Sequence, residues 1–427
     1  MPQMLVLADD LTGAADCAVA CAAHGLRTYV ALNDHAGPTD ADVLAIDADT
    51  RAASPEAAAI ATARLMHKHA SSPGILVYKK LDSTLRGNVA AELASALDAR
   101  RAITTRQRIV AVFAPAFPAA GRTTVNGRLL VRGTPLEQTD LWQYERTSPP
   151  PDIPALFSDA HLRSAVVPLS AIRGPALNES MLALAQDADI LVCDAETDDD
   201  LRAIAHASMA LGRETLWAGS AGLAHHLPPA AGLVPAAPAP AREPLSIGPT
   251  LFVVGSGASA SRQQAELLES WPDLISVRVT PSVLRTGEHT PEWRAHQAAL
   301  HQAFSAGVDA LVTLGADSGG ATEQDPHLAT ALAEIVRPFA GSIGALVATG
   351  GATARAIFHA WGIHSLHVMG EVEPGLPWSI AAAWRRPLPV LTKAGGFGKP
   401  ETLLHCRHFL RALNRSAASR PASTQDH

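Results

Sequence analysis

Cysteine is scarce in this chain, which has four cysteines among 427 residues. That number is too small for a disulfide framework in a chain of this length. Cys17 and Cys21 lie one helical turn apart, but no motif with further His or Cys ligands lies nearby. We therefore interpret both as small buried core residues and predict no structural zinc site.

Excess positive charge and long apolar runs are also missing. The formal net charge is -7, which argues against a general nucleic-acid-binding protein because such a protein carries a basic surface. No apolar run approaches the ~18 residues of a membrane-spanning helix. The chain enters its first apolar run at 4–8 with no basic stretch or cleavage site before it. We therefore expect a cytoplasmic protein with no nucleic-acid or membrane partner, and we allow for a homo-oligomer.

Short apolar runs alternate with Ala-rich segments along the chain. The runs are continuous rather than alternating in polarity, which is typical of parallel strands with helices on both faces. We expect strands at 4–8, 28–32, 43–46, 75–78, 109–113, 165–169, 190–193 and 216–218, and after a Pro- and Ala-rich linker at 251–254, 274–279, 310–314, 345–348, 366–369 and 389–391. We therefore predict two α/β domains with mainly parallel sheets, at 1–228 and 249–414. The linker is expected at 229–248, a disordered tail at 415–427, and the active site in the interdomain cleft.

The loop 79–88, with the sequence KKLDSTLRGN, carries a dense set of polar groups. It follows the predicted strand 75–78 and offers two ammonium groups, a carboxylate, two hydroxyls, a guanidinium and an amide. Ligands of open α/β sheets bind at the carboxyl ends of strands, and planar cations with small donors suit a carboxylate or a phosphate. The loop therefore indicates a binding site for a small polar anion.

Two adjacent acids, Asp9 and Asp10, follow the predicted strand 4–8 and precede a helix. Such a pair can bind a hydroxyl, act as a general base or hold a cation. The alternative is that Asp10 or Thr12 only caps the helix. We favour the functional interpretation because a single cap does not need two adjacent acids at the end of a strand.

Two further arginines follow predicted strands in the first domain. Arg51 offers a fork for a carboxylate, although an ordinary polar loop explains its segment equally well. Arg122 is a weaker candidate than Arg86. The Asn126-Gly127 pair just after Arg122 predicts a hairpin turn between two short strands.

Three glycine-rich turns follow predicted strands in the second domain. The turn 255–261 is similar to the G-x-G-x-x-G/A pattern, in which backbone N–H groups contact phosphate. The turns 349–354 and 393–400 have the same position relative to their strands. Each alone also fits a structural turn, but three together indicate close approach of the backbone to a nucleotide. An NAD-dependent dehydrogenase is disfavoured because the strand 274–279 does not end in the acid that the dinucleotide pattern needs.

An acidic, arginine-bearing pocket in one domain and a glycine-rich site in the other suit phosphoryl transfer, which needs positioning and charge neutralisation more than covalent chemistry. The chain resembles the four-carbon acid sugar kinase family nearly end to end. The motifs that carry the resemblance are ADDLTGA at 8–14, DSTLRGN at 82–88, AFPAAGRT at 116–123, GSAGLA at 219–224, Gly350-Gly351 before a helix, and KAGGFG at 393–398.

The resemblance implies an N-terminal domain that binds a four-carbon sugar acid and a C-terminal domain that binds ATP. It also implies phosphorylation of the 4-hydroxyl by ATP and Mg²⁺. The amino-acid sequence of the loop 79–88 resembles that of the D-threonate and D-erythronate kinases more than that of the 3-oxo-tetronate kinases. We therefore expect D-threonate as substrate, with D-erythronate or 3-oxo-tetronate as alternatives. An NAD-dependent oxidoreductase and a non-enzymatic sugar-acid-binding protein are more distant alternatives.

The resemblance also assigns residues. The expected substrate contacts are Asp10, Arg51, Asp82, Ser83, Thr84, Arg86 and Arg122. The expected ATP contacts are Ser256, Ser259, Gly350, Gly351, Ala352, Thr353, Gly395 and Gly396. We expect Arg51 or Arg86 to anchor the substrate carboxylate, and Asp9 or Asp10 to accept the proton of the 4-hydroxyl. The family usually has an acid where this chain has Ala352, and the candidate replacements are Glu371 and Glu373.

Overall fold

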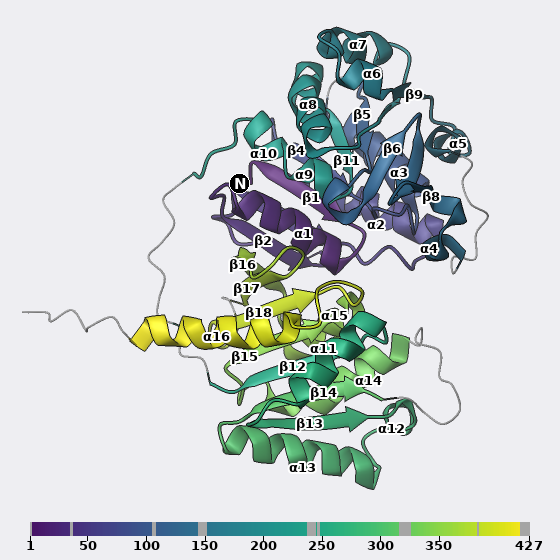
Figure 1. Cartoon of the computed structure of the whole chain (residues 1–427). Helices are drawn as coiled ribbons and strands as arrows, with labels where there is room; N and C mark the ends of the chain where they lie inside the picture. Colours follow the sequence, from purple (N-terminus) through teal and green to yellow (C-terminus); the bar gives the residue numbers. More distant parts are fainter. Residues whose placement is uncertain are drawn as a thin grey trace, which may run out of the picture. The chain divides into compact units, whose positions relative to one another are not determined.

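The computed structural model describes residues 2–34, 37–104, 108–143, 152–236, 245, 248–315, 326–381 and 384–418. The chain divides into two compact units, Met1–Pro238 and Ala239–His427. Figure 1 colours the first unit purple to teal and the second green to yellow. Much of the predicted linker 229–248 lies outside the described residues, and its first residues belong to the helix α10 (Leu227–Ala230). Within the described ranges, no helix is both long and apolar enough to cross a membrane.

A parallel sheet forms the centre of the first unit. Its strands, in spatial order, are β2 (Thr28–Leu32), β3 (Val43–Asp47), β1 (Met4–Ala8), β4 (Leu76–Lys80), β11 (Leu216–Gly219), β5 (Ala111–Ala114), β10 (Ile190–Cys193) and β9 (Ser164–Val167). The pairings between these neighbours are parallel. Strands β1 and β4 are buried along their whole length, as expected for strands covered by helices on both faces.

Different helices cover the two faces of this sheet. On one face, α2 (Pro55–His69) and α3 (Val89–Ile103) share an apolar core with Leu7 and Val77. On the other face, α1 (Leu11–Ala22) packs beside α9 (Ala221–Ala224), and the Tyr78 hydroxyl donates a hydrogen bond to the carbonyl oxygen of Ser220. Because successive side chains of a strand point to opposite faces, neighbouring residues of β4 meet different helices.

The remaining helices of the first unit are short or lie at its edge. They are α4 (Asp140–Gln143), α5 (Ile153–Ser158), α6 (Leu169–Ile172), α7 (Leu177–Leu184) and α8 (Asp198–Ser208), with the 3-10 helices η1 (Pro118–Ala120), η2 (Leu136–Gln138) and η3 (Met209–Leu211). Helix α8 begins with a capping box in which Thr197 and Asp200 each accept a hydrogen bond from the other's backbone N–H.

A separate antiparallel sheet of β6 (Arg122–Val125), β7 (Arg128–Val131) and β8 (Thr134–Pro135) lies between β5 and β9 in the sequence. The turn from β6 to β7 has φ of 52° at Asn126 and 70° at Gly127, which is typical of a two-residue hairpin. The Asp194 carboxylate accepts hydrogen bonds from the N–H groups of both turn residues, at 2.6 and 2.9 Å. The hairpin predicted from the Asn-Gly pair is therefore confirmed.

The second unit has a mixed sheet. Its strands, in spatial order, are β13 (Leu274–Val279), β14 (Asp309–Leu314), β12 (Thr250–Val254), β15 (Ala345–Thr349), β18 (Leu388–Lys393), β17 (Pro377–Ala381) and β16 (Ser365–Glu371). The pairings from β13 to β18 are parallel, and β17 pairs antiparallel with β18 and β16. The helices are α11 (Ser259–Glu269), α12 (Pro281–Thr286), α13 (Pro291–Ser305), α14 (Pro326–Val336), α15 (Gly351–Trp361), α16 (Thr402–Ala418) and the 3-10 helix η4 (Arg337–Phe339).

The predicted fold, two α/β domains with mainly parallel sheets, is confirmed. Several bounds differ by a few residues, the short strand β8 was not predicted, and three further differences have a clear cause. The strand expected at 165–169 ends at Val167, because Pro168 precedes the helix α6. Strand β17 was not predicted, since it begins with a proline and carries a serine in its middle. Helix α16 extends to Ala418, past residue 415, where we expected the tail to begin, and residues 419–427 lie outside the described part.

Candidate functional site

The guanidinium of Arg51 binds both acids that follow β1. It donates hydrogen bonds to the two carboxylate oxygens of Asp9 at 2.7 and 2.9 Å, and to the two oxygens of Asp10 at 2.6 and 2.8 Å. Asp10 also caps α1 by accepting a hydrogen bond from the backbone nitrogen of Gly13 at 2.8 Å. Asp10 is thus a helix cap and a member of a charged cluster at the same time. We call Asp9, Asp10, Arg51 and Asp82 the acid–arginine cluster.

The parallel sheet explains why these side chains meet. Strands β3 and β4 flank β1, and Ala8 at the end of β1 is in register with Asp47 and Lys80. The residues that follow these three strands therefore lie at one edge of the sheet. Asp82 joins the cluster from the β4 side, with its carboxylate 3.7 Å from the Arg51 guanidinium.

Arg51 holds the buried acids in their ionised form. Burial alone would raise the pKa of Asp9, whose side chain is 1% exposed, but Arg51 and Lys80 lower it below the ordinary value. The pKa of Asp82 is lowered in the same way, against burial, by Arg86 and Arg51. The acids in turn raise the pKa of Arg51 despite its burial. Asp9, Asp82 and Arg51 are therefore ionised at neutral pH.

The Asp82 carboxylate organises the loop after β4. It accepts hydrogen bonds from the backbone nitrogen and hydroxyl of Thr84, and two from the Arg86 guanidinium at 2.8 Å each. Ser83 lies half-buried in the same turn. The Asn88 side chain donates to two backbone oxygens of the β3–α2 loop at 2.9 Å. The loop is therefore held in a defined shape beside Arg51.

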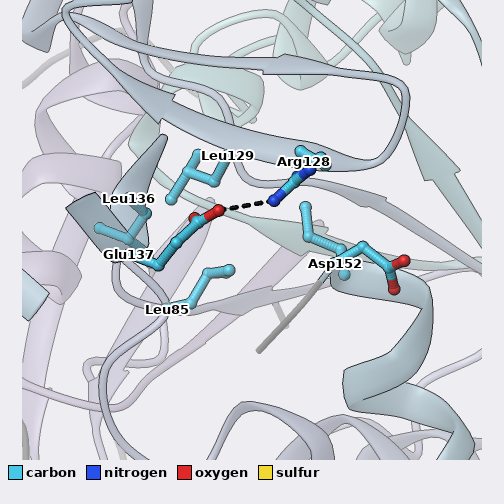
Figure 2. A pocket seen from close by; sticks show the side chains of 7 residues that line it. Leu85, Arg128, Leu129, Leu136, Glu137 and Asp152 are labelled. Carbon is cyan, nitrogen blue, oxygen red and sulfur yellow. Dashed lines mark hydrogen bonds and ion pairs between the residues drawn. The ribbon is translucent and has the colours of Figure 1, made fainter. Parts of the chain in front are cut away.

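Leu85 anchors this loop to the antiparallel hairpin. Leu85 is buried with φ of 60°, and it belongs to the same apolar core as Leu129 and Leu136. Figure 2 shows these leucines together, next to an ion pair of 2.6 Å between Arg128 and Glu137. The cavity that they line is about 10 Å³, which is too small for a sugar acid. Its walls serve to fix the loop against the hairpin.

Arg122, at the start of β6, lies near the Asp82 loop. Its Nε atom is buried and has no hydrogen-bond partner in the described part of the chain. Burial lowers the pKa of Arg122, and the charges of Asp82, Arg132 and Arg86 also act on it. Three arginines therefore share one end of the site with a single carboxylate, which favours a bound anion. Arg132 was not among the expected residues, because its sequence context carries no motif.

The two lysines of β4 have different surroundings. Lys79 faces α3, where its ammonium forms a buried ion pair with Glu92 and donates to the carbonyl oxygen of Leu7 at 3.4 Å. Lys79 therefore belongs to the core of the first unit and not to the group of side chains after β4. Lys80 faces α1 and is 5% exposed. Burial alone would lower its pKa, but the charges of Asp9 and Asp10 raise the pKa above its ordinary value.

The three glycine-rich turns of the second unit also come together. They follow β12, β15 and β18, which are neighbours in the sheet. A Cβ atom on Gly395 would lie 2.0 Å from the Ser256 hydroxyl oxygen, and one on Gly255 would lie 2.1 Å from that of Thr353. Gly350 has φ of 98°, which favours glycine. Only glycine therefore permits the close approach of these turns.

The rest of the predicted nucleotide residues surround these contacts. Gly351, Ala352 and Thr353 form the first turn of α15, and Ala352 is exposed there. Ser259 is the exposed first residue of α11, and Gly396 is exposed in the turn after β18. Helix N-termini and free backbone N–H groups are suited to phosphate. The structure thus brings the two sets of predicted residues into one cluster in each unit.

Lys393 fixes the turn after β18. Its ammonium donates to the carbonyl oxygens of Ala394 and Phe397 at 2.8 and 2.9 Å, while the Ser261 hydroxyl donates to Gly395 at 2.6 Å. Burial lowers the pKa of Lys393 to about 8. Lys393 therefore holds the turn in its conformation through hydrogen bonds to the carbonyl oxygens of the turn.

The proposed substitutes for the missing acid at position 352 are engaged elsewhere. Glu373 accepts a hydrogen bond from the Thr402 hydroxyl and lies 3.1 Å from the His405 ring. Glu371 accepts one from the backbone nitrogen of Gly375 at 3.3 Å. Among the described residues, no group of three or more His, Cys, Asp or Glu side chains could hold a metal ion.

Family models match both units. Residues 4–227 match a model described as a sugar-binding N-terminal domain, and residues 251–403 match one described as a nucleotide-binding C-terminal domain. A protein from Salmonella typhimurium LT2 has a similar solved structure, with a TM-score of 0.78, 23% identity, and 96% of this chain and 100% of that chain covered. That likeness supports the fold alone.

Two curated relatives cover nearly the whole chain. A D-threonate kinase of Cupriavidus necator is 39% identical over 94% of this chain and 96% of its own length. A D-threonate kinase of Salmonella typhimurium is 33% identical over 96% of this chain and 99% of its own length. With both domain models matched in order and relatives of this identity along the full length, the chain belongs to the four-carbon acid sugar kinase family.

Proposed function

We propose that this protein is a D-threonate 4-kinase, which transfers the γ-phosphoryl group of ATP to the 4-hydroxyl of D-threonate. The observation that carries the proposal is the pairing of acids and arginines at one edge of the first sheet, where hydroxyls and a carboxylate can be bound together. The choice of D-threonate is supported by the names of the two relatives. A cytoplasmic location, where ATP is available, fits this activity.

Arg122 is a better anchor for the substrate carboxylate than Arg51. Arg51 already directs its hydrogen bonds to Asp9 and Asp10, so its role is to position these acids. Arg122 has a buried Nε without a partner in the described part of the structure, and Arg86 lies in the adjacent loop. Arg86 already directs two hydrogen bonds to Asp82, so we assign the carboxylate to Arg122, because a guanidinium matches a carboxylate.

Asp10 is the better candidate for the general base. Its side chain is 24% exposed, whereas that of Asp9 is 1% exposed and closed in by Arg51. In the proposed step, the bond from O4 to the γ-phosphorus forms while the bond from that phosphorus to the ADP oxygen breaks. The proton of the 4-hydroxyl moves to the Asp10 carboxylate. Asp82 orients the substrate through the loop that it organises.

The three glycine-rich turns are the proposed site for the ATP phosphates. Their backbone N–H groups, the hydroxyls of Ser256 and Ser259 and the N-terminus of α15 would contact phosphate oxygens. Mg²⁺ would neutralise charge on the β- and γ-phosphates. It would arrive with the nucleotide, since the described residues offer no cluster of ligands for a resident ion.

ADP formation measured with D-threonate, L-threonate, D-erythronate and 3-oxo-tetronate tests the proposal. We expect the highest kcat/KM for D-threonate. A higher kcat/KM for D-erythronate or 3-oxo-tetronate would show that this acid, and not D-threonate, is the preferred substrate. Thermal stabilisation by a tetronate without ADP formation would indicate a binding protein, and stabilisation by NAD but not by ATP with Mg²⁺ would indicate an oxidoreductase.

A further inference from the structure

Lys80 carries a buried ammonium group that the proposed mechanism leaves unused. It is the last residue of β4 and is 5% exposed. Its Nζ atom lies against Gly13 in the first turn of α1, because a Cβ atom on Gly13 would be 2.5 Å from Nζ. The same Cβ atom would be 2.8 Å from a carboxylate oxygen of Asp10. The ammonium and the proposed base therefore border the same small space.

The ammonium of Lys80 has no bound partner within the described residues. It donates no hydrogen bond and forms no close ion pair there, since Asp9 and Asp10 are both taken by Arg51. The two acids act on Lys80 at longer range and keep it protonated. An ammonium without a hydrogen-bond acceptor is costly to bury. Its N–H groups are therefore available to an oxygen atom of a ligand.

Lys79 provides the contrast within the same strand. Its side chain points to the opposite face and is neutralised by Glu92, with both groups buried in the core. Among the described residues, Lys79 thus has an acid as close ion-pair partner, whereas Lys80 has only acids at longer range. A purely structural role explains Lys79 but leaves the unpaired ammonium of Lys80 without an explanation.

We propose that Lys80 contacts the substrate, donating a hydrogen bond to the oxygen of the hydroxyl that is phosphorylated while Asp10 accepts its proton. This inference rests on the proposed kinase function. A hydroxyl has one proton and two lone pairs. With the proton directed to Asp10 and one lone pair held by Lys80, the second lone pair is left to attack phosphorus. Lys80 keeps its proton throughout and stabilises the negative charge that develops on O4.

Binding in the absence of ATP tests this contact directly. Calorimetry would compare D-threonate with its 4-deoxy analogue, on the wild type and on Lys80→Met. The wild type should bind the analogue roughly 10- to 150-fold more weakly, the factor that a hydrogen bond to a charged group provides. Lys80→Met should show a clearly smaller preference for D-threonate, because the hydroxyl has lost the charged donor and keeps only its hydrogen bond to Asp10. If Lys80→Met is too unstable to titrate, Lys80→Gln replaces it, since it lacks the charge but keeps an N–H donor, and should show a reduced preference.

The neighbouring lysine supplies the matched control. Lys79→Met combined with Glu92→Met removes the buried pair as a unit, which proteins tolerate far better than the loss of one partner. This double variant should keep the wild-type preference for the 4-hydroxyl. A Lys80→Met variant that still discriminates like the wild type would overturn the inference, as would a wild type that binds both acids equally. With either outcome, ADP formation with D-threonate would still support the kinase proposal. A wild type that turns over no tetronate would contradict the kinase proposal and the role of Lys80 together.

Discussion

Removal of the Arg51 guanidinium is a demanding test of the acid–arginine cluster. Arg51 makes four hydrogen bonds to two carboxylates, of which Asp9 is 1% exposed and Asp10 is 24% exposed. Taking one partner from a buried ion pair costs roughly 3–5 kcal/mol, because the remaining charge is left uncompensated. We therefore expect Arg51→Met to lower the free energy of unfolding of the first unit by roughly 3–5 kcal/mol at pH 7.

The loss should depend on pH in a defined direction. In the wild type, the pKa of Asp9 is lowered below its ordinary value of 3.8. The resulting stabilisation is present above that value and is lost as the pH falls through the lowered pKa of the folded state. Without Arg51, the largest remaining effect on Asp9 is burial, which raises its pKa. The stability gap between wild type and variant should therefore narrow as the pH falls from 7 towards 4.

Urea unfolding followed by circular dichroism would measure both effects. Arg202→Met is the control, because Arg202 forms an exposed ion pair with Asp199 at 2.9 Å, with side chains 59% and 78% exposed. Such pairs contribute roughly 0–1 kcal/mol. The reasoning would be refuted by an Arg51→Met variant as stable as the Arg202→Met control, or by a stability gap that stays constant with pH.

Three further predictions concern the two sites. Asp10→Asn should lower kcat by roughly 10²- to 10⁴-fold with the fold retained by circular dichroism, and near-normal turnover would show that Asp10 is not the base. Arg122→Gln should raise KM for D-threonate more than it changes kcat, while an unchanged KM in steady-state assays would remove Arg122 from the carboxylate site. Gly395→Ala should weaken ATP binding, since its Cβ atom would lie 2.0 Å from the Ser256 hydroxyl oxygen. Gly341→Ala, whose Cβ atom meets nothing within 4 Å, is its control, and equal ATP affinity of the two variants by calorimetry would contradict the phosphate site.

The sequence predicted well those features that depend on local pattern. Continuous apolar runs located the parallel strands, and polar residues just after them indicated which loops meet at one sheet edge, as Asp9, Arg51 and Asp82 do. The Asn-Gly pair located the hairpin. In each case, the residues of the segment itself are enough to predict the feature, and no distant partner has to be known.

Features that depend on distant partners were missed. The pairing of Arg51 with both acids was not predicted. We expected Arg51 or Arg86 to anchor the substrate carboxylate, and this pairing is the reason why we propose a positioning role for Arg51 instead. The different roles of Lys79 and Lys80 depend on which helix covers each face of β4, and Glu92 is known to be the partner only once α3 is placed. Strand alternation could have separated the two lysines, but only after the strand had been extended to Lys80.

The antiparallel hairpin has a consequence for how this family could change its substrates. It carries Arg122 and lies between β5 and β9 in the sequence, yet none of its strands belongs to the parallel sheet. Its connection to the anion end of the site runs through the packing of Leu85 against Leu129 and Leu136. A substitution among these leucines would therefore shift one arginine against the acids, while the strands of the parallel sheet keep their places. If Arg122 binds the substrate carboxylate as proposed, selectivity among acids of different length can be tuned by substitutions that never touch the substrate.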